Sequence, residues 1–179
     1  MIREIREDDV GAVVALVHEL ADYEREARSC TLTSAQLRSA LFGPAPALFG
    51  HVAEVGGEVV GCALWFLNFS TWRGVHGVYL EDLYVRPAHR GAGLGRALLA
   101  RLAAVCAERG YARLEWSVLN WNEPSIGFYR ALGAQRQDEW SVYRLDRDAL
   151  AALAVEGEEG LNGVRPAGPD PSTTPGTAR

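Results

Sequence analysis

The chain has 179 residues, of which 48% are hydrophobic and 23% are charged, and its formal net charge is −5 at pH 7. A chain of this length can bury a substantial core and is predicted to form one main domain. The acidic balance does not favour a nucleic-acid-coating protein, and no apolar run approaches the ~18 residues that a membrane-spanning helix needs.

The cysteines and the first residues of the chain indicate a cytoplasmic protein. Cys30, Cys62 and Cys106 are odd in number and widely spaced, and they form no cluster with the histidines. This pattern favours a reducing compartment over a disulfide or zinc scaffold. The opening MIREIREDDV lacks the apolar stretch of a signal peptide. We therefore expect a cytoplasmic location, without a metal, nucleic acid or membrane partner.

The first half of the chain is predicted to form a strand, two helices and a β-hairpin. Residues 2–6 form the strand, and a helix capped by Asp8 or Asp9 follows, because apolar residues then recur every three or four positions. Thr33 caps a second helix, which ends at Gly43-Pro44. Two apolar runs, 48–55 and 58–69, flank Gly56-Gly57, which is the signature of a tight hairpin turn.

The second half alternates strands and helices. Strands are expected at 78–85, 112–119 and 139–145, and helices at 93–109 and 124–132. Hairpins combined with one β-α-β unit predict an α/β domain on a mixed sheet, in which the two strands of that unit are parallel. We expect this domain to span residues 1–155. Residues 156–179 are rich in Gly, Pro, Ser and Thr and are predicted to be a disordered tail.

A glycine-rich junction, RGAGLG at residues 90–95, connects the predicted strand 78–85 to the longest predicted helix. Free N–H groups at a helix start bind anions, and glycines let a ligand approach the backbone closely. The chain has no lysine, which excludes a Walker loop, and the GxGxG spacing departs from the dinucleotide fingerprint. A phosphate site is therefore predicted, with a ligand-free turn as the alternative.

Two segments together resemble the GNAT acetyltransferase family. They are Arg-x-x-Gly-x-Gly after a strand ending in Val-x-Pro, and NEPSIGFY at residues 122–129 followed by Gly133-Ala134. The resemblance covers residues 1–145 and implies the GNAT fold. This fold is an α/β architecture with a mixed, mostly antiparallel central sheet flanked by helices and a β-α-β core that binds the coenzyme. It also implies acetyl-CoA as cosubstrate.

Four strings narrow the resemblance: DYE at 22–24, YLEDLYV at 79–85, RGAGLG, and WNEPSIGFY at 121–129. They are similar to those of the diamine (spermidine/spermine) acetyltransferases and their thialysine-acetylating relatives. The resemblance implies a homodimer and a small cationic amine substrate. It implies substrate contacts by Tyr23, Glu24, Glu81 and, near the last predicted strand, Glu139 or its neighbour Asp138. It implies coenzyme contacts by Leu83, Tyr84, Val85, Arg90, Gly91, Ala92, Gly93, Leu94, Gly95, Arg96, Asn122, Glu123, Pro124 and Ser125.

The chemistry of acetyl transfer gives roles to two of these residues. An aliphatic amine has a pKa near ~10.4 and must lose a proton before it attacks. Glu81 is expected to accept that proton or, alternatively, to anchor the ammonium group. The resemblance implies that Tyr129 is the proton donor to the leaving thiolate, and a packed core tyrosine is the alternative. Asp82 is interpreted as part of a solvated face, and membership of the acidic set that binds the cationic substrate is the alternative.

The expected function is thus acetyl-CoA-dependent acetylation of a primary amine on a polyamine, diamine or lysine-like amino acid, by direct attack in a ternary complex. The first alternative is a GNAT enzyme of another specificity, such as a protein N-terminus or an aminoglycoside. The second is a non-catalytic acyl-CoA-binding regulatory domain.

Overall fold

A computed structural model describes the fold of residues 1–163 and the side chains of residues 1–157. The chain divides into two compact units, Met1–Ala134 and Gln135–Arg179, and each is described by itself. In the described part of the chain, no helix combines the length and hydropathy needed to cross a lipid bilayer.

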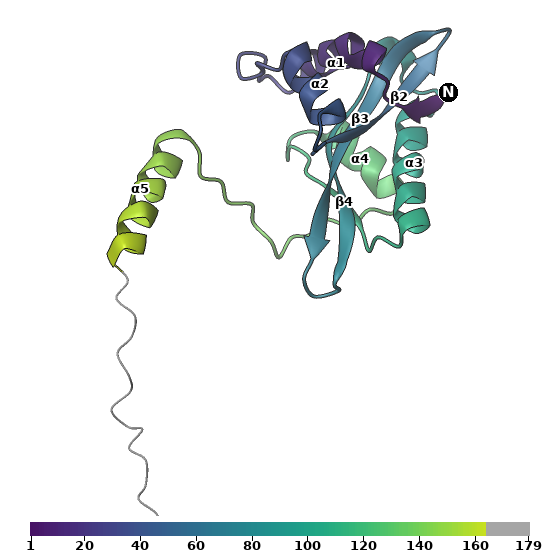
Figure 1. The fold of residues 1–179 in the computed structure, drawn as a ribbon. Coiled ribbons are helices and arrows are strands. Elements are labelled where there is room, and N and C mark those ends of the chain that lie inside the picture. Colours follow the sequence, from purple (N-terminus) through teal and green to yellow (C-terminus); the bar gives the residue numbers. More distant parts are fainter. Residues whose placement is uncertain (164–179) are drawn as a thin grey trace, which may run out of the picture. The chain divides into compact units, whose positions relative to one another are not determined.

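The first unit is built on a five-stranded sheet in the order β1-β2-β3-β4-β5 (Figure 1). Its strands are β1 (Ile2–Glu4), β2 (Phe49–Val55), β3 (Glu58–Ser70), β4 (Val75–Val85) and β5 (Leu114–Trp116). Its α-helices are α1 (Val10–Tyr23), α2 (Ser34–Phe42), α3 (Leu94–Arg109) and α4 (Glu123–Ala131), with short 3-10 turns at Glu7–Asp9 and Pro87–His89. The strands β1 to β4 pair antiparallel with one another, and β5 is parallel to β4.

Helices cover both faces of this sheet, which explains why β3 is apolar along most of its length (Figure 1). On one face, Val13 and Leu16 of α1 belong to a buried cluster with Cys62 of β3. On the other face, Leu98 and Leu102 of α3 belong to a second cluster. The mixed α/β fold is therefore confirmed, as is the hairpin, whose turn glycines Gly56 and Gly57 have φ angles of 59° and 84°.

An irregularity in β4 sets the geometry of its second half. Leu64 of β3 pairs with Asp82 and the next residue, Trp65, pairs with Leu80, so Glu81 is the extra residue of a β-bulge. Bulges bend a strand and redirect its side chains. Without the bulge at Glu81, the side chains of Glu81 and Asp82 would point to opposite faces of the sheet.

The parallel strands β4 and β5 pair only briefly. Their register runs from Val78 opposite Leu114 to Leu80 opposite Trp116. Beyond Leu80, β4 continues to Val85, and there β3 is its only partner among the described strands. The strand expected at residues 112–119 is accordingly limited to three residues, because the chain after Trp116 has no strand beside it.

The second unit differs from the expectation in two places. The strand predicted at residues 139–145 is wrong: Glu139 lies in a turn, and the residues after it have no regular secondary structure and pair with no described strand. An isolated strand would leave its backbone N–H and C=O groups without partners. Helix α5 (Arg147–Gly163) then continues through residues 156–163, which were expected to be disordered. Its run of Ala, Leu and Glu favours a helix despite Gly157. The remainder of the expected tail, residues 164–179, lies outside the described residues, and the domain boundary at 155 stays a prediction.

Candidate active site

The end of α1 is tied to the start of α4. The Tyr23 hydroxyl donates a hydrogen bond to Asn122 Oδ1 at 3.0 Å. The same oxygen accepts from the Ser125 backbone N–H at 3.3 Å and so caps α4. Asn122 is only 5% exposed, which fixes this link in place. Trp121 completes the junction, with its ring 6.2 Å from that of Tyr23 and the Arg25 guanidinium 4.8 Å from its ring centre.

Three carboxyl groups influence one another beside this junction. Burial and, to a smaller extent, the negative charges of Glu81 and Glu24 together raise the pKa of Asp82 to about 6. Burial also raises the pKa of Glu24. Glu81 is exposed and Asp82 is half-buried. The bulge therefore brings two neighbouring carboxylates of β4 into electrostatic contact with a third from α1.

Asp82 corrects the interpretation of the sequence, which placed it on a solvated face. It lies opposite Leu64, and directly paired residues share one face of a sheet. Leu64 belongs to the cluster beneath α1 and α2. A carboxyl group whose pKa is near 6 is ionised at neutral pH and can still accept a proton, which suits a general base. Asp82 is therefore a better candidate for that role than the exposed Glu81.

Tyr129 lies on α4 against the last residue of β5. Its ring centroid is 4.9 Å from that of Trp116 and 5.3 Å from that of Phe128. Burial, and then the charge of Glu24, raise the pKa of Tyr129 to about 12. The phenol is thus neutral at physiological pH. Its hydroxyl makes no hydrogen bond to any residue in the described part of the chain, so it is available to a ligand.

The glycine-rich junction forms the start of α3. Gly91 and Gly93 both have a φ of 80°, in the left-handed region that favours glycine. The first helical bond runs from the Ala97 N–H to the Gly93 carbonyl, at 2.9 Å. The N–H groups of residues 94–96 precede this bond, so they have no acceptor within the helix. Together with the helix dipole and the exposed Arg96, they form a site for an anion.

Arg90 has a different position from the one that the sequence suggested. Its Nε donates to the Val85 carbonyl at 2.7 Å, which holds the side chain against the end of β4. Its guanidinium lies 5.3 Å from the ring centre of Tyr23 and 5.4 Å from that of Tyr84. Arg90 therefore joins α1 to β4, and its contact with the coenzyme stays a prediction.

The other predicted site residues fall into two groups. Those in the first unit gather at the ends of β4 and α1 and at the starts of α3 and α4, with Glu123, Pro124 and Ser125 in the first turn of α4. Glu139 and its neighbour Asp138 belong to the second unit, where both are exposed, and their role in binding substrate stays a prediction. The sequence assigned no catalytic role to Asp82, because side-chain alternation cannot reveal a bulge.

Comparisons with known proteins agree with this geometry. Residues 13–134 match the model of the Acetyltransferase (GNAT) family. Thialysine N-epsilon-acetyltransferase from Bos taurus is 37% identical over 86% of this chain and 96% of its own length. Spermidine/spermine N(1)-acetyltransferase-like protein 1 from Homo sapiens is 30% identical over 87% of this chain and 24% of its own length. An integron cassette protein from the mobile metagenome of V. cholerae shares the fold, with a TM-score of 0.73 and 24% identity over 86% of this chain and 96% of its own.

The region that matches the family model contains β4, the glycine-rich junction, α3 and most of the site around Tyr129. The chain therefore belongs to the GNAT acetyltransferase family and is an N-acetyltransferase.

Proposed function

We propose that this enzyme uses acetyl-CoA to acetylate a primary amine of a small cationic substrate, namely a polyamine, a diamine or a lysine-like amino acid. The observation that carries this proposal is the group of three carboxylates, Glu24, Glu81 and Asp82, beside the neutral Tyr129. Such a group attracts a cation and supplies both a proton acceptor and a proton donor. The names of the thialysine and spermidine/spermine relatives point to the same class of substrate.

The residues present fit coenzyme A. The free N–H groups at the start of α3, with Arg96, hold the pyrophosphate. Among the described strands, the backbone of β4 at residues 83–85 pairs with β3 alone. Its other edge is available to the pantetheine arm except at the Val85 carbonyl, which accepts from Arg90 Nε. Asn122 and the first turn of α4 form the second contact region. The coenzyme supplies an acetyl thioester to the site between these regions.

Reaction proceeds by direct attack of the amine on the thioester carbonyl in a ternary complex. Asp82 accepts one proton from the substrate ammonium, directly or through a water, and frees the nitrogen lone pair. The C–N bond forms and the C–S bond breaks. Tyr129 delivers its proton to the leaving sulfur and takes up the second proton of the amine, so the phenol ends the step neutral. Glu24 and Glu81 anchor the positive charge of the substrate.

The high pKa of Tyr129 limits its ability to donate a proton to the leaving sulfur. A thiol has a pKa near ~8.5, whereas the pKa of Tyr129 is raised to about 12. Complete proton transfer from the phenol to a free thiolate would be uphill by roughly 5 kcal/mol. Tyr129 therefore acts mainly by hydrogen bonding to the negative charge that develops on sulfur, and it passes on the proton that the amine releases.

The enzyme works as a homodimer in the cytoplasm. Trp140, Val142 and Tyr143 are 71%, 86% and 94% exposed, and a second copy of the chain is the partner that covers them. Aromatic and β-branched residues favour strand pairing, which the segment 139–145 lacks in the isolated chain. The cytoplasmic location rests on Cys30, Cys62 and Cys106, which are all free thiols.

A thiol-release assay with acetyl-CoA tests the function. The amine panel contains spermidine, spermine, putrescine, lysine, thialysine, an aminoglycoside and a basic peptide. Turnover of at least one small amine is expected, with a loss of roughly 10²–10⁴-fold in Tyr129→Phe. Tyr111→Phe, which removes a hydroxyl from another half-buried tyrosine, serves as the matched control and should keep full activity. Turnover of only the peptide or the aminoglycoside would overturn the substrate class, and coenzyme binding without any turnover would overturn the enzymatic proposal.

A further inference from the structure

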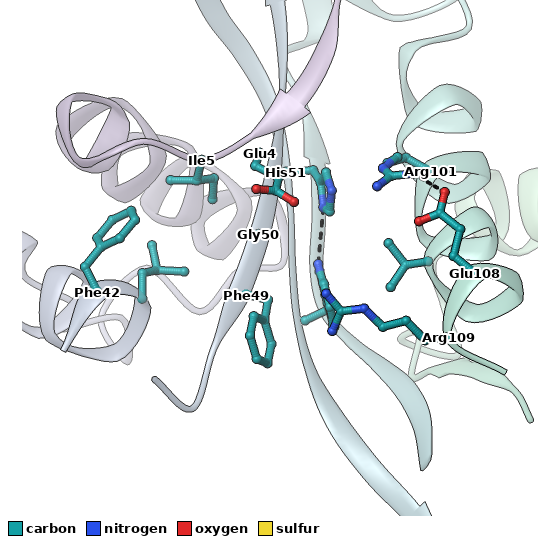
Figure 2. A pocket seen from close by; sticks show the side chains of 12 residues that line it. Glu4, Ile5, Phe42, Phe49, Gly50, His51, Arg101, Glu108 and Arg109 are labelled. Atoms are coloured by element: carbon teal, nitrogen blue, oxygen red, sulfur yellow. Dashed lines mark hydrogen bonds and ion pairs between the residues drawn. The ribbon is translucent and has the colours of Figure 1, made fainter. Parts of the chain in front are cut away.

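A pocket of about 260 Å³ lies on the part of the first unit that contributes nothing to the candidate active site. Its walls come from β1, β2, β3, α2 and the second half of α3, and none of its lining residues belongs to β4, β5 or α4 (Figure 2). The volume is below the range typical of drug-sized ligands, so the pocket suits a small metabolite rather than a nucleotide.

A buried histidine in the wall of this pocket has one unused hydrogen-bond donor. His51 is 2% exposed, and Trp65 Nε1 donates to its Nδ1 at 3.3 Å. An indole N–H can only donate, so Nδ1 must be an acceptor and the proton of the neutral ring must be on Nε2. Burial lowers the pKa of His51, which keeps the ring neutral. The Nε2–H finds no acceptor among the described residues, and a buried unpaired donor costs about 1–3 kcal/mol.

Charged residues of both signs line the same pocket (Figure 2). Arg101 and Glu108 of α3 pair with each other at 2.8 Å. Arg109 of α3 and Glu4 of β1 also line the pocket, and within residues 1–157 neither forms an ion pair. The pocket thus presents one guanidinium and one carboxylate that are not neutralised by the protein.

The rest of the wall is apolar. Ile5, Leu41 and Val105 are buried aliphatic residues of the lining. Phe49 stacks on Trp65 with ring centroids 4.7 Å apart. A hydrocarbon group of modest size would be removed from water against these side chains, at roughly 25 cal/mol per Å² of buried apolar surface.

We propose that this pocket binds a small apolar α-amino acid in its zwitterionic form. The ligand carboxylate accepts hydrogen bonds from His51 Nε2–H and Arg109, and its ammonium group pairs with Glu4. The apolar side chain lies against Phe49 and Val105, which pack in the same cluster on the α3 face of the sheet. A simple carboxylate would leave Glu4 unpaired beside it, and a simple amine would leave the donors of His51 and Arg109 without an acceptor.

Isothermal titration without acetyl-CoA tests the proposal, with leucine and phenylalanine as ligands. Each is compared with the carboxylate that lacks the ammonium group, 4-methylpentanoate or 3-phenylpropionate, and with the amine that lacks the carboxylate. The amino acid is expected to bind at least tenfold more tightly than either analogue. Arg109→Gln should weaken its binding tenfold or more, whereas Arg73→Gln, a change at an exposed arginine outside the pocket, should leave it unchanged.

A second variant tests the histidine itself. His51→Asn keeps an acceptor for Trp65 and removes the Nε2 donor, and thermal unfolding reports whether the variant remains folded. Folded His51→Asn should also bind the amino acid at least tenfold more weakly. The absence of saturable amino-acid binding to the wild type, carboxylate binding as tight as that of the amino acid, or binding that survives Arg109→Gln would each overturn the proposal.

Discussion

The pKa of the Asp82 carboxyl group is set more by the surroundings of the side chain than by its own chemistry. Partial burial and two neighbouring carboxylates raise its pKa to about 6 from an ordinary value of 3.8. Glu81, the adjacent residue, is exposed at the tip of the bulge. In the proposed mechanism, Asp82 therefore acts as the base and Glu81 as an anchor for positive charge.

The pH dependence of activity should distinguish the roles proposed for Asp82 and Glu81. A base must be deprotonated to act, and the pKa of the ligand-free enzyme governs kcat/KM, so wild-type kcat/KM should rise with pH through about 6. Asp82→Asn should lower kcat by roughly 10²-fold or more and remove this acidic limb. Glu81→Gln should mainly raise the KM of the amine and keep the limb. Steady-state kinetics from pH 5 to 9 would decide, and loss of the limb in Glu81→Gln alone would assign the base to Glu81.

Asp82→Asn should make the folded protein more stable, although it lowers activity. A carboxyl group whose pKa is raised in the folded state opposes folding once it ionises, so its cost appears as the pH rises from about 4 through about 6. Asp82→Asn removes that cost and should stabilise the protein at pH 7.5 by at most about 3 kcal/mol. Urea unfolding should show this gain shrinking toward zero at pH 4. A gain that does not change with pH would contradict the assignment.

At the scale of the elements, the coenzyme site depends on the backbone conformation before α3. An alanine at a φ of 80° is strained by roughly 1–2 kcal/mol, so Gly93→Ala should distort the amides that face the pyrophosphate. The KM for acetyl-CoA should rise about 5- to 30-fold while the KM of the amine stays the same. Gly11→Ala within α1, where the added methyl group meets no atom within 4 Å, is the matched control and should have no effect on either KM.

Features of the helices and strands that depend on local contacts could be predicted from the sequence, whereas features that depend on distant contacts could not. The cap of α2 was predictable, because Thr33 and Gln36 bond to each other's backbone, at 3.3 and 2.9 Å, through local contacts alone. The hairpin turn and the start of α3 are local in the same way. The bulge at Glu81 and the early end of β5 depend on how two distant strands meet, and the isolated segment 139–145 depends on a missing partner strand. The link between Tyr23 and Asn122 joins residues 99 positions apart, which no local pattern encodes.

At the scale of the whole molecule, the exposed segment 139–145 predicts how the protein assembles. Burial of Trp140, Val142 and Tyr143 against a second copy should make the wild type a dimer in solution. Val142→Asp combined with Tyr143→Asp should shift the mass measured by light scattering from that of two chains to that of one. Arg136→Asp, a charge change at an exposed position before the segment, should leave the dimer intact. A monomeric wild type would contradict the proposal.

The separation of β4 from β5 makes the second half of β4 an unpaired edge inside a sheet. Open edges of this kind invite pairing with another chain and lead to aggregation. Here the open stretch is only residues 81–85, and Glu81, Asp82 and Arg90 place charges along or beside it. The charged side chains that we assign to substrate and coenzyme thus also discourage a foreign strand from adding to the sheet. Replacing them with apolar residues would remove activity and turn the same stretch into a site of self-association.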